Sequence, residues 1–399
     1  MNETSNGFRV AVVATVYRPL SHADVIVSRW LKPRPADVDW GWPRPRSHIV
    51  SMYVEQRADD DMSADISAQH DVPLFDDVAS ALCLGGDRLD VDAVLLIGEH
   101  GDYPTNDIGQ LLYPRKELFD RIVEVFRRSG RSVPVFCDKH LSWNFEWASE
   151  MVATAQSLGF MLISSSSIPL CRRIPPLDLA GSKRVKQAMA VFYGPDEAYG
   201  YHSYEFVQAI IERRRGGETG IAAITVHRGD DVWRWLDDTG TSGALLDAAV
   251  AAVGRENPKH VRDGDLRTNC INQKGDGPMA VCLEYVDGMH LAHVSLNGHI
   301  TNWGLAIRTD SDDPPLATAP AADDDTHFYG HFATMSRVIE DAFIDGRPPF
   351  SPARSLMTTG ITSFAMQARS RPGTRLPTPD LRIAYDQIDL PDSDRVWIQ

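Results

Sequence analysis

The chain has 399 residues, of which 43% are hydrophobic and 24% are charged, and its formal net charge at pH 7 is −15. This length is sufficient for two domains, each with its own hydrophobic core. The acidic balance argues against nucleic acid or an anionic membrane as a main partner, so we expect neither.

The cysteines and the amino-terminal residues indicate the cellular compartment of the protein. Five cysteines, an odd number, lie far apart, which is typical of reduced thiols and offers no paired zinc-site spacing. The segment Met1 to Gly7 has no Lys or Arg, and no apolar run approaches the length of about 18 residues that a membrane span needs. We therefore expect a cytoplasmic protein without a signal peptide or a membrane helix.

The first part of the chain alternates strands with helices. Arg9 to Ala14 is a short apolar run, typical of a buried parallel strand, and Ser21 with Asp24 indicates the start of a helix that ends near Leu31. Further strands are expected at 48–55, 91–97, 133–137 and 161–164, with helices at 76–84, 114–129 and 144–158. Strands separated by helices of this length predict right-handed crossovers and a doubly wound parallel sheet. Residues 1–165 are thus predicted to form a Rossmann-like domain in an α/β protein.

The pattern changes after about residue 180. Strands at 185–193 and 220–227 are expected to flank a helix from about Tyr201 to Arg213, and two helices are expected near 332–345 and 353–368. The runs 278–285, 289–295 and 301–308 are expected to be consecutive antiparallel strands, joined by turns at Asp287-Gly288 and Asn297-Gly298. Residues 166–399 are therefore predicted to form an α+β domain with an open, mostly antiparallel sheet. The free face of that sheet would suit a homo-oligomer.

Titratable residues stand where two strands of the first domain are expected to end. Glu99 and His100 follow the strand 91–97, and Asp138, Lys139 and His140 follow the next. Ligands on doubly wound sheets bind beyond the carboxyl ends of the strands, and adjacent strands lie about 4.8 Å apart. These side chains are therefore expected within roughly 10 Å of one another.

A second group lies at the start of the predicted helix near residue 201. His202 and Glu205 are three residues apart, so they share a helical face, and Glu197 lies just before them. An imidazole and a carboxylate on one face can orient a base, bind a hydroxyl or hold a metal. The same residues would also suit an ordinary polar helix start.

The turn after the first strand contains no glycine. A dinucleotide-binding fold needs glycine there for the tight turn and for close approach of the diphosphate, and Val16 would place a β-branched side chain against it. Either a nucleotide is bound differently, by Thr15, by Arg18 pairing with a phosphate and by the helix start at Ser21, or the nucleotide site is lost. Glu55, which ends the second strand, stands where an acid would hold a ribose diol, or else is a solvated strand end.

Several segments together resemble the glucose-fructose oxidoreductase / inositol dehydrogenase (Gfo/Idh/MocA) family over nearly the full length. The segment Val91 to Ile97, the segment Val133 to Leu141 and the helix after it are similar to the family's strand, its Glu-Lys-Pro strand end and the following helix. Gly200-Tyr-His-Ser-Tyr-Glu205 resembles the Gly-x-His-x-x-Asp segment of the substrate domain. Gly346-Arg-Pro-Pro349 resembles the family's closing segment.

The resemblance implies a domain that binds NAD or NADP and a second domain that shapes the substrate site. Lys139 matches the Lys of Glu-Lys-Pro, and His202 matches the His of the family's Asp-x-Gly-x-His motif. The Asp position of that motif falls on Ala198, with Glu197 beside it. We expect Lys139, His202, Glu197 and His140 to be the catalytic residues.

Three functions stay open at this point. The first is an oxidoreductase with atypical cofactor use, acting on a small sugar- or polyol-like substrate in a cleft between the domains, where Lys139 positions the hydroxyl and His202 takes its proton. The second is a non-redox lyase, isomerase or hydrolase that uses zinc, manganese or iron, held by Glu99, His100, His140, His202 and Glu205. The third is a ligand-binding regulator without catalysis.

Overall fold

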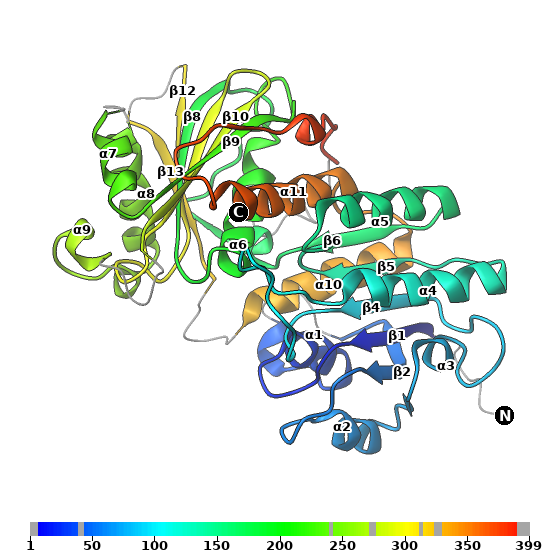
Figure 1. Cartoon of the computed structure of the whole chain (residues 1–399). Coiled ribbons are helices and arrows are strands. Elements are labelled where there is room, and N and C mark those ends of the chain that lie inside the picture. Colours follow the sequence, from blue (N-terminus) through cyan, green and yellow to red (C-terminus); the bar gives the residue numbers. More distant parts are fainter. Residues whose placement is uncertain are drawn as a thin grey trace. The chain divides into compact units, whose positions relative to one another are not determined.

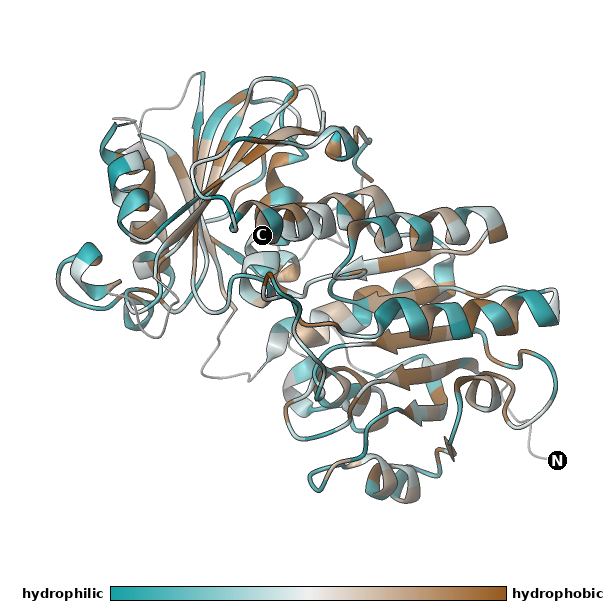
Figure 2. Ribbon diagram, viewed as in Figure 1, coloured by the Kyte–Doolittle hydropathy of each residue, from teal (hydrophilic) through white to brown (hydrophobic). Residues whose placement is uncertain are grey.

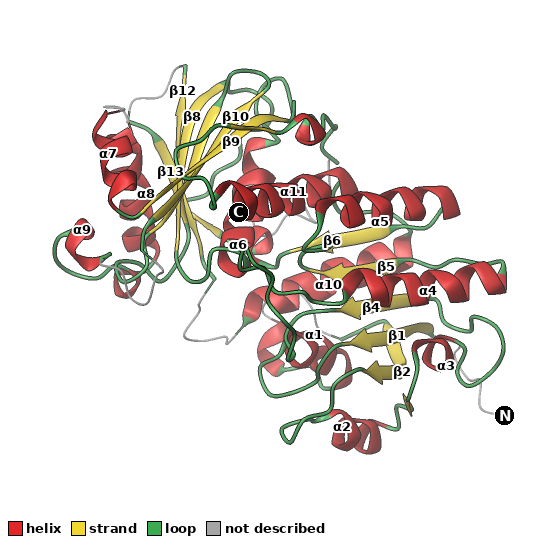
Figure 3. Cartoon of the chain, viewed as in Figure 1, coloured by secondary structure: helices red, strands yellow, loops and turns green. Residues whose placement is uncertain are grey.

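A computed structural model describes residues 7–38, 44–238, 242–270, 277–310, 314–322 and 329–388. The chain folds into two units, each built around its own sheet (Figures 1 and 3). The first unit comprises residues 1–105, 111–167 and 323–352, and the second comprises 106–110, 168–322 and 353–399. The segment 323–352, which the sequence analysis places in the second domain, thus belongs to the first unit.

The sheet of the first unit has six parallel strands in the order β3-β2-β1-β4-β5-β6. The strands are β1 Phe8–Ala14, β2 Ser47–Val54, β3 Leu74–Phe75, β4 Ala93–Ile97, β5 Val135–Asp138 and β6 Leu162–Ser165. The order reverses at β1 and β4, as in a doubly wound fold, and ligands bind such folds outside the carboxyl ends of these strands. β4 is apolar along its length and β1 is apolar from Val10 to Ala14 (Figure 2), which is typical of a sheet buried on both faces. The predicted Rossmann-like sheet is confirmed.

The helices of the first unit are α1 His22–Leu31, α2 Ser63–His70, α3 Val78–Leu82, α4 Arg115–Ser129, α5 Phe145–Leu158 and α10 Gly330–Asp345, with a short turn of 3₁₀ helix at Pro35–Val38. α4 buries a continuous apolar stripe, and it ends at Gly130, whose φ of 63° suits a helix terminus. α2 is not predicted by the sequence analysis. Its sequence SADISAQH has no apolar stripe, and Ser63 is its one buried residue.

A buried carboxylate on α10 binds this helix to the first unit. Glu340 Oε1 accepts hydrogen bonds from the backbone N–H of Arg46 at 2.7 Å and of Ser47 at 2.8 Å, and from Ser47 Oγ at 2.6 Å. These bonds fix the helix to the start of β2, almost 300 residues earlier in the sequence. Phe343 stacks on Phe8 of β1, with ring centroids 6.5 Å apart.

The second unit contains an eight-stranded sheet in the order β14-β9-β10-β11-β8-β12-β13-β7. The strands are β7 Arg173–Ile174, β8 Val185–Phe192, β9 Ile221–Arg228, β10 Met279–Tyr285, β11 His290–Ser295, β12 Gly304–Thr309, β13 Leu316–Pro320 and β14 Leu376–Pro377. β11 and β8 pair in parallel and the other pairs are antiparallel, so the sheet is mixed but mostly antiparallel, as predicted.

The neighbours of β11 and β12 in this sheet differ from the prediction. The turn at Asp287-Gly288 joins β10 to β11 as expected, but β8 lies between β11 and β12. The prediction that Asn297-Gly298 closes a hairpin is therefore wrong. Asn297 instead accepts a hydrogen bond on Oδ1 from Gly194 N at 2.6 Å, which ties the turn to the end of β8.

Helices pack on both faces of the second sheet. The helices of this unit are α6 Ala198–Ile211, α7 Asp230–Asp238, α8 Ser242–Glu256, α9 Leu266–Asn269 and α11 Pro352–Ala368, with 3₁₀ turns at Ile168–Leu170, Pro258–His260 and Pro379–Leu381. α8 buries Leu245, Ala249 and Val253 against the strands, and a side chain at Gly304 of β12 would place its Cβ 2.5 Å from Ala249 O. α7 and α8, which the sequence analysis does not predict, thus cover part of one sheet face. The homo-oligomer through this sheet stays a prediction.

Within the described ranges, no helix is long and apolar enough to cross a lipid bilayer. All five cysteines are free thiols, and Cys282 alone among them is partly exposed.

Candidate functional site

A buried carboxylate holds two cations at the ends of β4 and β5. Glu99 Oε1 accepts a hydrogen bond from Lys139 Nζ at 2.9 Å, and Glu99 Oε2 pairs with the Arg115 guanidinium. The exposed fractions are 6% for Glu99, 4% for Lys139 and 1% for Arg115. Burial by itself would raise the pKa of Glu99, but Lys139 and Arg115 together hold that pKa well below its ordinary value. The predicted proximity of Glu99 and Lys139 is confirmed.

Arg115 is a member of this cluster that the sequence analysis misses. It is the first residue of α4, and its guanidinium lies over the Tyr113 ring, 4.9 Å from the centroid. Its Nε and one terminal nitrogen are buried without a hydrogen-bond partner. A cation at a helix amino terminus opposes the helix dipole, and this is the signal from which the sequence could have indicated its role.

His22, which is also absent from the sequence prediction, binds the residue before Lys139. It is the first residue of α1, and its Nδ1 lies 2.6 Å from Oδ2 of Asp138, the last residue of β5. The backbone N–H of His22 donates to Nδ1 of His100 at 3.4 Å. The His22 ring meets the edges of His100 and Phe332, at centroid distances of 5.0 and 5.2 Å. The strand ends of β4 and β5 are thus connected to the start of α1.

His100 and His140 are neutral imidazoles near pH 7. Burial, followed by the neighbouring His22, lowers the pKa of His100 to about 4. Burial, followed by Arg115, lowers the pKa of His140 well below its ordinary value. His140 Nδ1 lies 2.7 Å from the carbonyl oxygen of Ser142, so this nitrogen carries the proton.

In the turn between β1 and α1, several backbone N–H groups donate hydrogen bonds to side chains of the same segment. The backbone N–H groups of Arg18 and Asp24 donate to Ser21 Oγ, at 3.2 and 3.3 Å, and Leu20 N–H donates to Asp24 Oδ2 at 2.9 Å. Thr15 Oγ1 donates to Glu99 O at 2.9 Å, and Val16 lies in the core. With the His22 N–H bonded to His100, this turn does not fit the usual backbone cradle for a diphosphate.

Two side chains near this turn still fit a nucleotide. Arg18 is partly exposed, and a guanidinium suits a phosphate. Glu55, directly after β2, is partly exposed and accepts a hydrogen bond from Tyr103 at 2.6 Å. Its position at this strand end is the one from which an acid binds a ribose diol.

The predicted residues of the second unit lie on and next to α6. His202 is 9% exposed, and its ring meets the rings of Tyr199 and Trp303, at centroid distances of 5.9 and 5.4 Å. Glu197 immediately precedes the first residue of the helix. Glu205 is fully buried and accepts a hydrogen bond from Thr358 Oγ1 of α11 at 2.6 Å.

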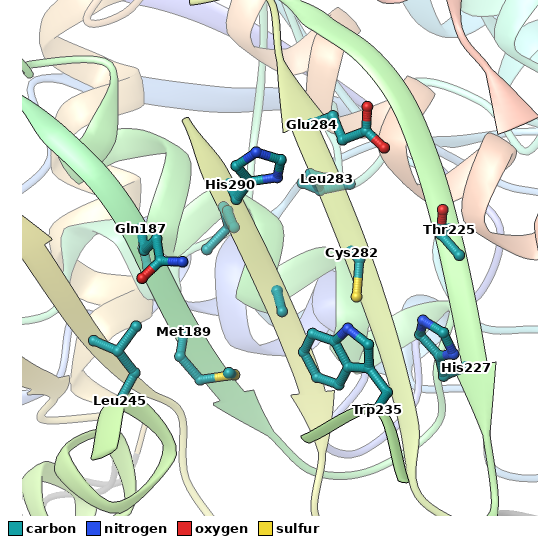
Figure 4. Close-up of a pocket in the computed structure, with 13 residues that line it drawn as sticks. Gln187, Met189, Thr225, His227, Trp235, Leu245, Cys282, Leu283, Glu284 and His290 are labelled. Atoms are coloured by element: carbon teal, nitrogen blue, oxygen red, sulfur yellow. The ribbon is translucent and has the colours of Figure 1, made fainter. Parts of the chain in front are cut away.

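A hollow of about 360 Å³ lies on the sheet of this unit, on the face that carries Met189 and Ala292 (Figure 4). His227 and Trp235 stack at its edge, with ring planes 17° apart. α6 packs on the opposite face, since Ser203 Oγ lies 2.8 Å from Nδ1 of His293. The hollow is therefore separate from the His202 side of the sheet.

The alternative set of metal ligands is not supported. Across the ranges that the structure describes, no three His, Cys, Asp or Glu side chains are grouped so as to hold a metal ion. Glu99 is bound by two cations and Glu205 by Thr358, so the carboxylates of the expected set already have partners within their own units.

Comparison with known proteins finds similarity in structure. No family model matches the sequence, and no curated protein matches it. GenD2 from gentamicin A biosynthesis, solved with NAD, is 14% identical, with a TM-score of 0.57 over 93% of this chain and 96% of that chain. For myo-inositol 2-dehydrogenase from Lactobacillus plantarum, the identity is 10% and the TM-score 0.55, over 93% and 99% of the two chains. UDP-N-acetylglucosamine 3-dehydrogenase GnnA from Acidithiobacillus ferrooxidans is 12% identical, with a TM-score of 0.54 over 92% of this chain and 98% of that chain.

Proposed function

Since the chain has the fold of the Gfo/Idh/MocA dehydrogenases, as its sequence predicts, we propose that it is an oxidoreductase acting on a hydroxyl group of a small polyhydroxylated molecule. Two proteins of similar fold are named as dehydrogenases of myo-inositol and of UDP-N-acetylglucosamine. These names support a sugar- or polyol-like substrate for this chain.

The observation that carries the proposal is the Lys139 ammonium, held at the end of β5 by Glu99. Lys139 is proposed to bind the substrate hydroxyl and to stabilise the negative charge that develops on oxygen as its proton leaves. Arg115 shares the Glu99 carboxylate, which leaves the cluster with one net positive charge and favours an anionic oxygen. His202 is the proton acceptor that the family resemblance implies, with Glu197 beside it, and His140 is a neutral imidazole next to Lys139.

NAD or NADP is the proposed cofactor, in an altered mode of binding. Glu55 would hold the ribose diol and Arg18 a phosphate, since the backbone N–H groups of Arg18, Leu20 and His22 in the β1–α1 turn already have acceptors. When bound, the nucleotide supplies a hydride acceptor. GenD2 was solved with NAD, which supports this choice.

A second candidate is a lyase or isomerase that uses the same cluster without hydride transfer. The N–H groups of Arg18, Leu20, His22 and Asp24 favour it, because they already have acceptors and so are not available to a diphosphate. In this case Lys139 would stabilise an anionic oxygen formed by proton transfer alone.

Nucleotide binding separates the two candidates. NADH and NADPH would be titrated into the purified protein by fluorescence, and into the variants Arg18→Gln and Glu55→Gln. The matched control is Arg88→Gln, an exposed position in the same unit. Micromolar binding that both site variants weaken about tenfold or more supports the oxidoreductase.

Turnover is measured alongside, with a panel of polyols and sugars that includes myo-inositol. Turnover without nucleotide binding would support the second candidate. Absence of both turnover and nucleotide binding would refute the two candidates together.

A further inference from the structure

The pair formed by His22 and Asp138 has the geometry of an oriented base. Because an ionised carboxylate is an acceptor, the 2.6 Å contact assigns the proton to His22 Nδ1. In the neutral ring the other nitrogen, Nε2, then carries a lone pair. We infer that His22, oriented by Asp138, takes the proton from the substrate hydroxyl, in place of the His202 that the family resemblance implies. This inference rests on the proposed function and names a residue that neither the sequence motifs nor the family resemblance indicates.

The burial of the two partners suits these roles. The Asp138 side chain is 2% exposed, whereas the His22 side chain is 13% exposed. A base must reach its substrate, and the group that orients it is best kept from water. The edge contacts with His100 and Phe332 fix the plane of the His22 ring, so the position of Nε2 is fixed as well.

The charged and titratable groups around His22 come from the ends of β4 and β5. Asp138 provides a negative charge in direct contact, which stabilises the imidazolium once the proton has arrived. His100 is neutral and accepts from the His22 backbone, so it adds no competing charge. Glu99 and Lys139 form an ion pair next to these two residues in the sequence.

The step consists of one proton transfer. The O–H bond of the substrate breaks, an N–H bond forms at His22 Nε2, and the electron pair stays on the substrate oxygen. The resulting negative charge is stabilised by the Lys139 ammonium, and the positive charge on His22 by Asp138. Either candidate function contains this step.

The first test reads the proton on His22 without any substrate. Nitrogen NMR of the imidazole, recorded in its neutral form, is expected to show the Nδ1–H tautomer, and Asp138→Asn is expected to reduce the population of that tautomer. An Nε2–H form in the wild-type protein would overturn the inference, whatever the protein catalyses.

The second test uses turnover with a substrate from the polyol and sugar panel. His22→Gln should lower kcat/KM by about 10²–10⁴-fold, with nucleotide affinity unchanged. His48→Gln, at an exposed position of β2, is the control and should leave kcat/KM unchanged. If His22 had only a structural role, His22→Gln would lower thermal stability and leave kcat/KM within about threefold of the wild-type value.

The outcomes keep the two proposals apart. If Lys139→Met abolishes turnover while His22→Gln keeps it within about threefold, the proposed function holds and the His22 inference fails. If both variants turn over like wild type, the proposed function fails together with the inference.

Discussion

The two units use the same kinds of residue for different purposes. At the strand ends of the first unit, charged groups bind one another within a few residues of the sheet edge, and His22 has a carboxylate on one nitrogen. On α6 of the second unit, His202 is packed among aromatic rings, and Glu205 is bound to α11. A histidine with a carboxylate three residues away is thus a weak indication of an acid–base pair, because each can find a partner on another element.

Glu212, the residue directly after α6, joins two later segments of the chain. Glu212 accepts hydrogen bonds from Arg354 of α11 at 3.2 Å and from the Tyr385 hydroxyl at 2.8 Å. Burial raises the pKa of Glu212, and Arg354 opposes that rise. Such a network specifies how α11 and the segment around Tyr385 dock at the end of α6.

Among the variants that compare the two units, the largest expected effect is a loss of activity at Lys139. Lys139→Met removes the ammonium that would stabilise the substrate oxygen, so turnover should fall by about 10²–10³-fold. Lys116→Met is the control, because Lys116 pairs with Asp120 at the surface of α4. Steady-state kinetics checks this, and equal rates for the two variants would remove Lys139 from the mechanism.

Arg115→Met tests how much the buried ion pair with Glu99 contributes to the stability of the first unit. Removing one partner from a buried ion pair is costly, and we expect a loss of about 3 kcal/mol in the free energy of unfolding. Arg121→Met makes the same chemical change on α4 at a half-exposed position and should cost under about 1 kcal/mol. Urea denaturation measures both, and a loss as small as that of the control would contradict the buried cluster.

Thr358→Val tests the second unit in the same way. It removes the hydrogen bond to the buried Glu205 carboxylate, which should cost about 2 kcal/mol. Thr362→Val, whose hydroxyl donates to a backbone carbonyl of the same helix, should cost less. Urea denaturation again measures the loss, and turnover should stay unchanged. A large loss of activity would indicate that Glu205 takes part in the reaction.

His100→Gln tests the pH dependence of stability. The pKa of His100 is lowered to about 4 by burial, so between the ordinary value and 4 the unfolded chain binds a proton that the folded chain does not. This contribution to stability is present above about pH 6.5 and is lost as the pH falls toward 4. The variant should therefore lose less stability than wild type over this range. Urea midpoints at several pH values measure the slope, and an unchanged slope would contradict a buried neutral His100.

The smallest effect is expected at Leu20, in the turn that lacks glycine. Leu20 has a φ of 63°, in the left-handed region that favours glycine. Leu20→Gly should raise the free energy of unfolding by about 0.5 kcal/mol, whereas Leu20→Ala should not. Thermal denaturation checks the difference, and destabilisation by glycine would show that the exposed leucine side chain contributes packing.

Much of the first unit was predictable because its signals are local. Apolar runs separated by helices predict a parallel sheet, and each strand end then brings the next residues to one edge. Glu99 and Lys139 were found in this way. His22 and Arg115 were missed. A cation at a helix amino terminus marks Arg115 as unusual, but a helix start gives no indication of which strand end it will reach.

The sequence by itself determined the two kinds of sheet, most helices of the first unit and the meeting of Glu99 with Lys139, because each follows from periodicity and from the geometry of parallel strands. Only the tertiary structure decided that β8 lies between β11 and β12, that α10 completes the first unit through Glu340, and that His22 binds Asp138. These outcomes depend on contacts between residues about 100 or more apart in the chain, and no local pattern encodes which distant partners meet.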